Sequence, residues 1–485
     1  MTPAPGLRRW LALALLGTAF FMVILDGTIV YVALPQIARD LGFSTGGVQW
    51  VMSAYLLCFG GLLLLGGRCA DLLGRRRVFM VGVGLFVCSS LLCGLAWSPA
   101  VLIGARVVQG VSAAIMAPTA LSILMTVFPD GPERNRALGI WGGIGGVGAT
   151  AGLLLGGPVT AAFGWRGVFF INIPVGLAVL GFSRALLPES SDSGCARCFD
   201  IAGAATVTTA LVLLIYGITG AAAEGWTGIR TIAPLAASAV LLGLFGLIEA
   251  RSRAPLVPLR IFRARALVGG NLVLLAAGMS VDGTLLIVTL YAQEVLGYSA
   301  VQFGLMTAVM TVMSAAGAYT AQAVVTRAGV RRVGAAGMAL VGAACLVLAR
   351  VPADGSYWPY LFFGLLVFGA GLGSAFVAAQ IAALTGAAEE ESGLAAGLAD
   401  SSFNIGSALG IATLSTVAVA WAGPGAGPAA MTEGFQAAFA AAVGIALLGA
   451  VVALLLFRPR VPVASSAAGP APAPDPEPLD GRRGP

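Results

Sequence analysis

The sequence predicts an all-helical protein that crosses a membrane many times. Of its 485 residues, 58% are hydrophobic and 10% are charged, whereas ordinary soluble domains are about half apolar and about a quarter charged. Apolar runs of roughly 20 residues recur along the chain, and each is long enough to cross ~30 Å of hydrocarbon as a helix. The runs are continuously apolar and do not alternate with polar residues, which favours helices over the strands of a barrel.

Polar, glycine or proline breaks divide the chain into fourteen predicted spans. The first continues from Arg8-Arg9 to Leu34 without a small-residue cleavage site, so we interpret it as a span and not as a cleaved signal. In order, the spans are expected at 11–34, 47–67, 77–97, 100–128, 137–163, 167–187, 200–221, 231–250, 266–291, 300–325, 333–351, 358–384, 393–421 and 434–457.

The arginines predict the orientation. All 27 basic residues are arginines, and most of them fall in the tails and loops that share one side with the N-terminus. Because such loops are cytoplasmic as a rule, we expect both termini in the cytoplasm of a cell-membrane protein. Residues 1–10 form the predicted N-tail, and the Pro-rich segment 458–485 is predicted to be a disordered cytoplasmic tail.

An internal repeat organises the spans. LDGTIVYVALP at 25–35 is matched by VDGTLLIVTLY at 281–291, and in the same frame LGFS at 41–44 matches LGYS at 296–299. The copies run in the same direction across the membrane, which predicts a 6 + 2 + 6 arrangement with parallel halves and a site near the midplane between them. The expected units are two six-helix bundles and an inserted helix pair, at 11–187, 266–457 and 200–250 respectively.

Several motifs resemble those of the major facilitator superfamily, specifically the fourteen-span drug:proton antiporters of the EmrB/QacA type. They are LDGTIVYVALP, GGRCADLLGRRRVF (66–79), RVVQG (106–110), WRGVFFINIPVG (165–176), YAQEVLGYS and SSFNIGSALG (401–410). The resemblance implies a major facilitator fold and proton-coupled export. Two positions depart from the family pattern, because Tyr31 replaces the usual Asn and Leu153 replaces a Pro of the antiporter motif. The small-residue stripe of that motif remains and is expected to pack helices closely: Gly148, Gly152, Gly156 and Gly157.

Asp26 and Arg106 are ionisable residues inside predicted spans, which makes them functional candidates. Counted from the span ends at ~1.5 Å per residue, both lie roughly 9–12 Å below the outer surface. We therefore expect an ion pair, extended by Gln109. Two interpretations remain open: a proton-coupling pair, or a permanent pair that holds the N-terminal half together.

Asp282 has no arginine at its depth, and burial of a carboxyl group without a cation disfavours its ionised form. Such a group can hold a proton or a cationic substrate, but not both. Since the chain has no histidine, a carboxylate must carry the proton, and Asp282 is preferred to Asp26. The predicted substrate cavity is lined by Asp26, Asp282, Gln109, Tyr31 and Asp400, although a hydrated role at a helix end is equally open for Asp400.

The loop between spans 2 and 3 is a predicted cytoplasmic gate, as the family resemblance implies. Its residues are Asp71, Gly74, Arg75, Arg76 and Arg77. Glycine permits the tight turn, and the arginines alternatively serve only topology. The predicted partners across the halves are Glu389, Glu390 and Glu391, whose alternative role is to complement a helix dipole.

These features favour a proton-coupled exporter of lipophilic drugs, dyes or antibiotics, with cationic compounds preferred, that works as a monomer. An uptake permease or uniporter on the same fold, with structural acids, is the alternative. The lack of histidine and of a nucleophile–base pair argues against an enzyme, and no GxxxxGK[ST] loop supports nucleotide-driven transport. Cys195 and Cys198 form a single CxxC motif without a second cysteine pair, and we interpret this spacing as incidental and not as a metal site. No metal, cofactor or nucleic-acid partner is expected.

Overall fold

A computed structural model describes residues 5–44, 47–129, 131–189, 201–252, 255, 257–354, 356–385, 392–423 and 427–457. These residues form fourteen α-helices and three short helical turns. The α-helices are α1 Pro5–Leu41, α2 Trp50–Leu73, α3 Arg75–Gly94, α4 Pro99–Val127, α5 Pro132–Phe170, α6 Asn172–Leu186, α7 Ile201–Glu224, α8 Ile229–Arg251, α9 Arg265–Leu290, α10 Ala300–Ala328, α11 Val330–Leu348, α12 Phe362–Leu384, α13 Ser392–Ala422 and α14 Pro428–Leu456. The short turns are η1 Leu259–Arg263, η2 Tyr291–Val295 and η3 Tyr357–Leu361.

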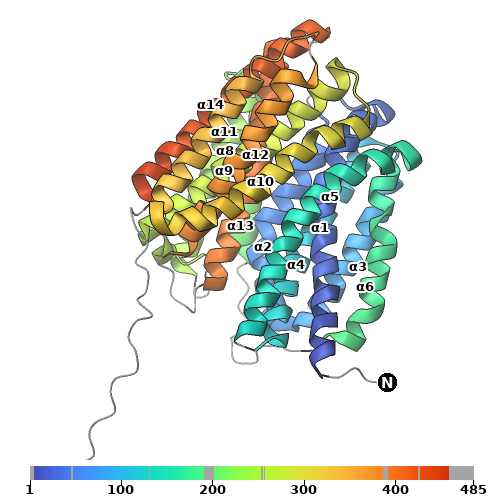
Figure 1. Ribbon diagram of the computed structural model, residues 1–485, viewed down its shortest axis with the longest axis vertical. Coiled ribbons are helices and arrows are strands. Elements are labelled where there is room, and N and C mark those ends of the chain that lie inside the picture. Colours follow the sequence, from blue (N-terminus) through green and yellow to red (C-terminus); the bar gives the residue numbers. More distant parts are fainter. Residues whose placement is uncertain are drawn as a thin grey trace, which may run out of the picture.

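The helices form two bundles joined by an inserted pair (Figure 1). We call α1–α6 the N-half, α9–α14 the C-half, and α7 with α8 the insert. Two seams join the halves: α5 packs against α10 along one, and α2 packs against α13 along the other. Helix α7 of the insert contacts both α2 and α13, whereas α8 packs mainly on α7. The insert therefore lies against one seam only.

Matching glycines support the internal repeat. Gly42 and Gly297, which follow the first helix of each half, both have φ of 68°. Gly74 and Gly329, which separate the second and third helices, have φ of 101° and 84°. Side chains with a β-carbon rarely adopt such angles, so glycine is required at each turn. The two halves thus bend at equivalent points of the repeat.

Thirteen stretches of the described residues are long and apolar enough to cross a membrane. One of them, Pro132–Leu186, has 55 residues, which at ~1.5 Å per residue far exceeds one crossing. Gly164, with φ of 69°, interrupts this stretch, and the predicted spans 137–163 and 167–187 lie on either side of it. One boundary differs from expectation, because α1 already begins at Pro5, inside the predicted tail 1–10. The predicted tail 458–485 lies outside the described residues.

The glycine stripe of α5 packs mainly against α1. A β-carbon at Gly148 would lie 3.1 Å from Ile24, one at Gly152 would overlap the hydroxyl of Thr28, and one at Gly156 would lie 2.7 Å from Val32. Small residues allow two helix backbones to approach this closely. Gly157 instead faces Val301 at the start of α10. The stripe therefore holds the N-half together and also meets the C-half.

Replacing Gly152 with valine is expected to lower the free energy of unfolding by about 1–3 kcal/mol, because the added methyl groups would force α5 away from α1. Gly143→Val provides the matched control, since nothing lies within 4 Å of a β-carbon at Gly143 on the same helix. The thermal unfolding midpoint of the purified protein in detergent measures the difference. Equal midpoints for the two variants would contradict this account of the packing.

Candidate transport site

Asp26 is enclosed at the centre of the N-half and accepts three side-chain hydrogen bonds. Arg106 Nη1 lies 2.6 Å from Oδ2 of Asp26, while Gln109 Nε2 and Asn172 Nδ2 donate to Oδ1 at 3.0 and 2.7 Å. The exposed fraction of all four residues is at most 1%. The expected pairing of Asp26 with Arg106, extended by Gln109, is therefore present, and α1, α4 and α6 each contribute to it.

Arg106 is itself held by neighbouring helices. Its Nε donates to the carbonyl oxygen of Val51 at 2.9 Å, and its guanidinium lies 4.1 Å from the ring centroid of Tyr55. Gln109 Nε2 also donates to Ser90 Oγ at 2.8 Å, which adds α3 to the network. If Asp26 were protonated, its O–H hydrogen would face N–H groups of Arg106, Gln109 and Asn172, which already donate to the carboxyl oxygens. The geometry thus fits a carboxylate that stays paired.

Sequence reasoning missed Asn172, although it stood within the quoted stretch WRGVFFINIPVG. The available signal was a polar amide inside an apolar run, which requires a buried partner. Three residues predicted to line the substrate cavity, Asp26, Gln109 and Tyr31, are enclosed in this structure. Their exposed fractions are 0%, because the helices of the N-half surround the ion pair and α1 meets α9 at Tyr31.

Asp282 pairs with Tyr31 across the two halves. The hydroxyl of Tyr31, on α1, donates to Asp282 Oδ1, on α9, at 2.7 Å. Asp282 is half-buried, and within the described ranges no arginine lies within ion-pair distance of it. Close by, Gln293 Nε2 donates to the carbonyl oxygen of Val32 at 3.1 Å. The two halves therefore meet through a carboxyl group that has a hydroxyl partner.

Asp400 occupies a different position on α13. Its side chain is exposed, and Gln380 Nε2 on α12 donates to Asp400 Oδ1 at 3.3 Å. Asn404 Nδ2 donates to the carbonyl oxygen of Asp400 at 2.8 Å. No described contact joins Asp400 to Tyr31 or Asp282. The structure does not unite the expected cavity residues into one cluster.

The basic loop after α2 contacts its own half. Gly74 makes the expected tight turn, Arg75 Nη1 donates to Thr126 Oγ1 at 2.8 Å, and Arg76 and Arg77 lie 3.4 and 3.6 Å from Glu189. Thr126 and Glu189 belong to the N-half, whereas the expected partners were acids of the C-half. The expected acids, Glu389, Glu390 and Glu391, lie outside the described residues, as does the side chain of Asp71.

No group of three His, Cys, Asp or Glu side chains that could hold a metal ion occurs in the described part of the chain. Cys195 and Cys198 lie outside that part. The candidate site is therefore built from carboxylates, amides, hydroxyls and one arginine.

The seam between α5 and α10 is closed at one end only. Gly157 of α5 abuts Val301, and a β-carbon at Gly304 of α10 would lie 2.5 Å from the carbonyl oxygen of Leu153. Gly146 and Gly139 follow on the same face of α5 by helical periodicity, yet nothing lies within 4 Å of a β-carbon at either position. The halves thus meet near Tyr31 and Gly157, which we call the distal end, and separate along this seam toward the terminal end, where α1 begins.

Several known proteins resemble this chain. A family model described as "Major Facilitator Superfamily" matches residues 16–196 and 270–479. The puromycin resistance protein pur8 of Streptomyces alboniger is 38% identical over 95% of this chain and 93% of its own length. The tetracenomycin C resistance and export protein of Streptomyces glaucescens is 37% identical over 85% of this chain and 77% of its own length. The multidrug resistance protein Stp of Mycobacterium tuberculosis is 34% identical over 85% of this chain and 76% of its own length.

Solved structures share the fold. A bacterial homolog of the human lysosomal transporter Spinster, in an inward-facing and unoccupied conformation, aligns with a TM-score of 0.65 at 17% identity, covering 93% of this chain and 97% of its own. The peptide transporter POT in complex with sulfate aligns with a TM-score of 0.67 at 16% identity, covering 91% of this chain and 93% of its own. At these identities the likeness concerns the fold alone.

Proposed function

The chain belongs to the major facilitator superfamily, and we propose that it exports antibiotics or other drugs from the cell in exchange for protons. It is a membrane transporter and not an enzyme. Three relatives that match most of the chain are named for resistance to, or export of, such compounds. The proposed substrate is a lipophilic cation, because the candidate site offers carboxylates, whose negative charge favours a positively charged substrate.

The proposed topology has fourteen spans with both termini in the cytoplasm. The break at Gly164 supports two crossings within Pro132–Leu186, and the arginine distribution supports the orientation. We propose that the protein works as a monomer, since each chain carries both halves of the repeat. In this orientation the terminal end is cytoplasmic, and the separated α5–α10 seam is on the side from which an exported substrate arrives.

One observation carries the coupling proposal: the contact between Tyr31 and Asp282. Asp282 has no arginine partner in the described residues and lies where the two halves meet. In our proposal it holds a proton or a substrate cation, but not both, while the halves alternate around it. Asp26 remains paired with Arg106 and serves as the framework of the N-half. This assigns the two repeated aspartates different roles.

The available driving force suffices for such an exchange. One pH unit across the membrane corresponds to about 1.4 kcal/mol per proton, and ~100 mV contributes about 2.3 kcal/mol only for each net charge that crosses. Exchange of one proton for one monovalent cation moves no net charge, so one pH unit sustains a substrate gradient of about tenfold.

Proteoliposomes with an acidic interior test the function. The purified protein should accumulate ethidium, or a member of an antibiotic panel that includes puromycin, and each addition should release protons measured with a trapped pH dye. Empty liposomes control for passive dye movement. If the protein moved substrate equally well with and without the gradient, and released no protons, the uniporter interpretation would replace exchange.

Replacing Tyr31 with phenylalanine is expected to shift the protein toward states open at the distal end. The lost hydrogen bond to a carboxylate is worth about 1.5 kcal/mol, or about tenfold in the ratio of open to closed states. Distances between spin labels at Phe43 and Asp354, in a background lacking the native cysteines, measure this ratio. The control is Tyr298→Phe, since the Tyr298 hydroxyl accepts from the Tyr357 amide within the C-half. An unchanged distance distribution for Tyr31→Phe would contradict the prediction.

A further inference from the structure

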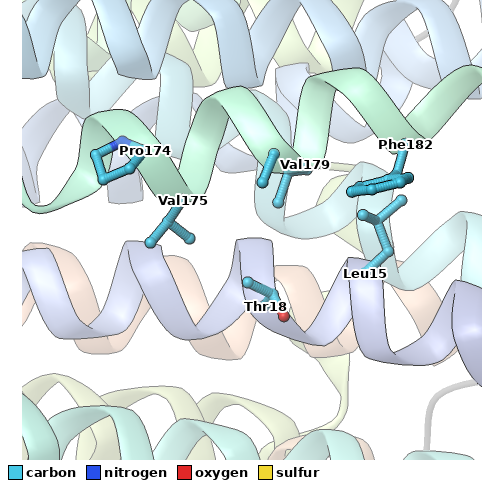
Figure 2. A pocket seen from close by; sticks show the side chains of 7 residues that line it. Leu15, Thr18, Pro174, Val175, Val179 and Phe182 are labelled. Carbon is cyan, nitrogen blue, oxygen red and sulfur yellow. The ribbon is translucent and has the colours of Figure 1, made fainter.

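A groove runs between α1 and α6 on the outside of the N-half. It has a volume of about 480 Å³, and we call it the α1–α6 groove. Its lining is apolar apart from Thr18. The lining residues are Leu15, Thr18, Pro174, Val175, Ala178, Val179 and Phe182. Figure 2 shows Val175 and Val179 of α6 pointing toward α1, with Phe182 and Leu15 facing each other at one end. The groove is separate from the candidate transport site, which the same helices enclose on their inner sides.

The position of the α1–α6 groove selects its occupant. Both helices cross the membrane, so the groove opens toward hydrocarbon. From Pro174 to Phe182 it extends roughly 12 Å along α6 at ~1.5 Å per residue, which lies within one leaflet of a ~30 Å hydrocarbon core. An acyl chain has the polarity and the width to fill such a groove.

Arg8 provides a headgroup contact at the end of the groove. Its Nη2 donates to the carbonyl oxygen of Ala185 at 3.0 Å, so the guanidinium bridges the start of α1 and the end of α6. Arg8, Leu15 and Thr18 lie on one face of α1 by helical periodicity, and Ala185 is one turn beyond Phe182. The side chain of Arg8 is exposed and makes no ion pair in the described residues, which leaves further guanidinium N–H groups for a phosphate.

We propose that the α1–α6 groove binds an anionic phospholipid, with one acyl chain between the helices and the headgroup phosphate on Arg8. The site lies in the leaflet at the terminal end. The bound lipid fills the space beside Val179 and ties the first helix of the N-half to the last. This inference is independent of the identity of the transported substrate.

Native mass spectrometry of the full-length protein in detergent tests the site. Phosphatidylglycerol and phosphatidylcholine with the same acyl chains are titrated separately. A single arginine near the surface favours an anionic headgroup by about fivefold, so the first phosphatidylglycerol should bind about fivefold more tightly than phosphatidylcholine. Arg8→Gln should remove this preference. Arg39→Gln is the matched control, because Arg39 lies at the other end of α1 and also donates to a backbone carbonyl, that of Pro35.

A second variant tests the acyl-chain contact. Ala178→Trp fills the groove and should abolish binding of the first lipid, whereas Leu177→Trp, on an exposed position beside it, should not. The proposal is overturned if wild type shows no headgroup preference, if Arg39→Gln loses it as fully as Arg8→Gln, or if Ala178→Trp binds lipid like wild type. It is also overturned if ethidium, and not phospholipid, shows binding that Ala178→Trp removes, because the groove would then be a drug path.

Discussion

Replacing Arg106 with leucine is expected to lower the free energy of unfolding by about 3–5 kcal/mol and to reduce transport to background. The substitution leaves the Asp26 carboxylate buried without its cation, and breaking a buried pair from one side carries a cost of this size. It also removes the donor to Val51 and the contact with the Tyr55 ring. The thermal unfolding midpoint in detergent measures the stability, and Arg39→Leu, an arginine outside the ion pair, is the control.

A double variant separates the loss of the pair from the loss of packing. Asp26→Leu combined with Arg106→Leu removes both charges and should recover part of the stability, since buried pairs can be replaced by apolar residues at little net cost. Asp26→Asn leaves Arg106 buried without its anion and should also lower the free energy of unfolding by about 3–5 kcal/mol, but the folded fraction should retain pH-driven transport if the pair is a framework. Loss of coupling in Asp26→Asn, with binding retained, would make Asp26 the proton carrier instead.

Replacing Asp282 with asparagine is expected to abolish proton-coupled accumulation while leaving the fold intact. The amide oxygen can still accept the hydrogen bond of Tyr31, so the contact between the halves survives, but the side chain no longer takes up a proton. With one pH unit across the membrane, wild type should accumulate substrate about tenfold per exchanged proton, and the variant should show no accumulation. Trapped pH dye and labelled substrate in proteoliposomes measure both quantities.

Two comparisons make this result specific. Asp354→Asn changes an exposed carboxylate in the loop between α11 and α12 and should transport like wild type. Asp282→Glu keeps a titratable group and should retain part of the coupling. If Asp282→Asn accumulated substrate as well as wild type did, the coupling role of Asp282 would be wrong, and Asp400 would be the next carboxylate to replace.

The sequence predicted the helices well because apolar length and arginine-rich breaks are local signals. It also predicted the approach of Asp26 and Arg106, since counting residues from span ends gives depth in the membrane. Depth does not give direction around a helix axis. For this reason the contact of Asn172 with Asp26, and that of Tyr31 with Asp282 across the halves, did not follow from the sequence.

The loop arginines illustrate another limit. The sequence analysis named only Glu389, Glu390 and Glu391 as partners of the loop arginines, and these acids lie outside the described residues. The structure places Glu189, which was not considered, beside Arg76 and Arg77, because α6 ends next to the turn at Gly74. Charge alone cannot choose among acids whose positions depend on how distant helices end.

The insert makes the two seams unequal. Gln49, at the start of α2, donates to Thr219 of α7 and accepts from Ser415 of α13, and its exposed fraction is 1%. Thr416 of α13 also donates to the carbonyl oxygen of Ile218 at 3.3 Å. One seam is thus bound by a helix of the insert, whereas in the described residues neither helix of the insert packs against α5 or α10. The halves would then rotate about the α2–α13 seam, against which α7 lies. The protein would open along the α5–α10 seam, and a bulky substrate would leave there.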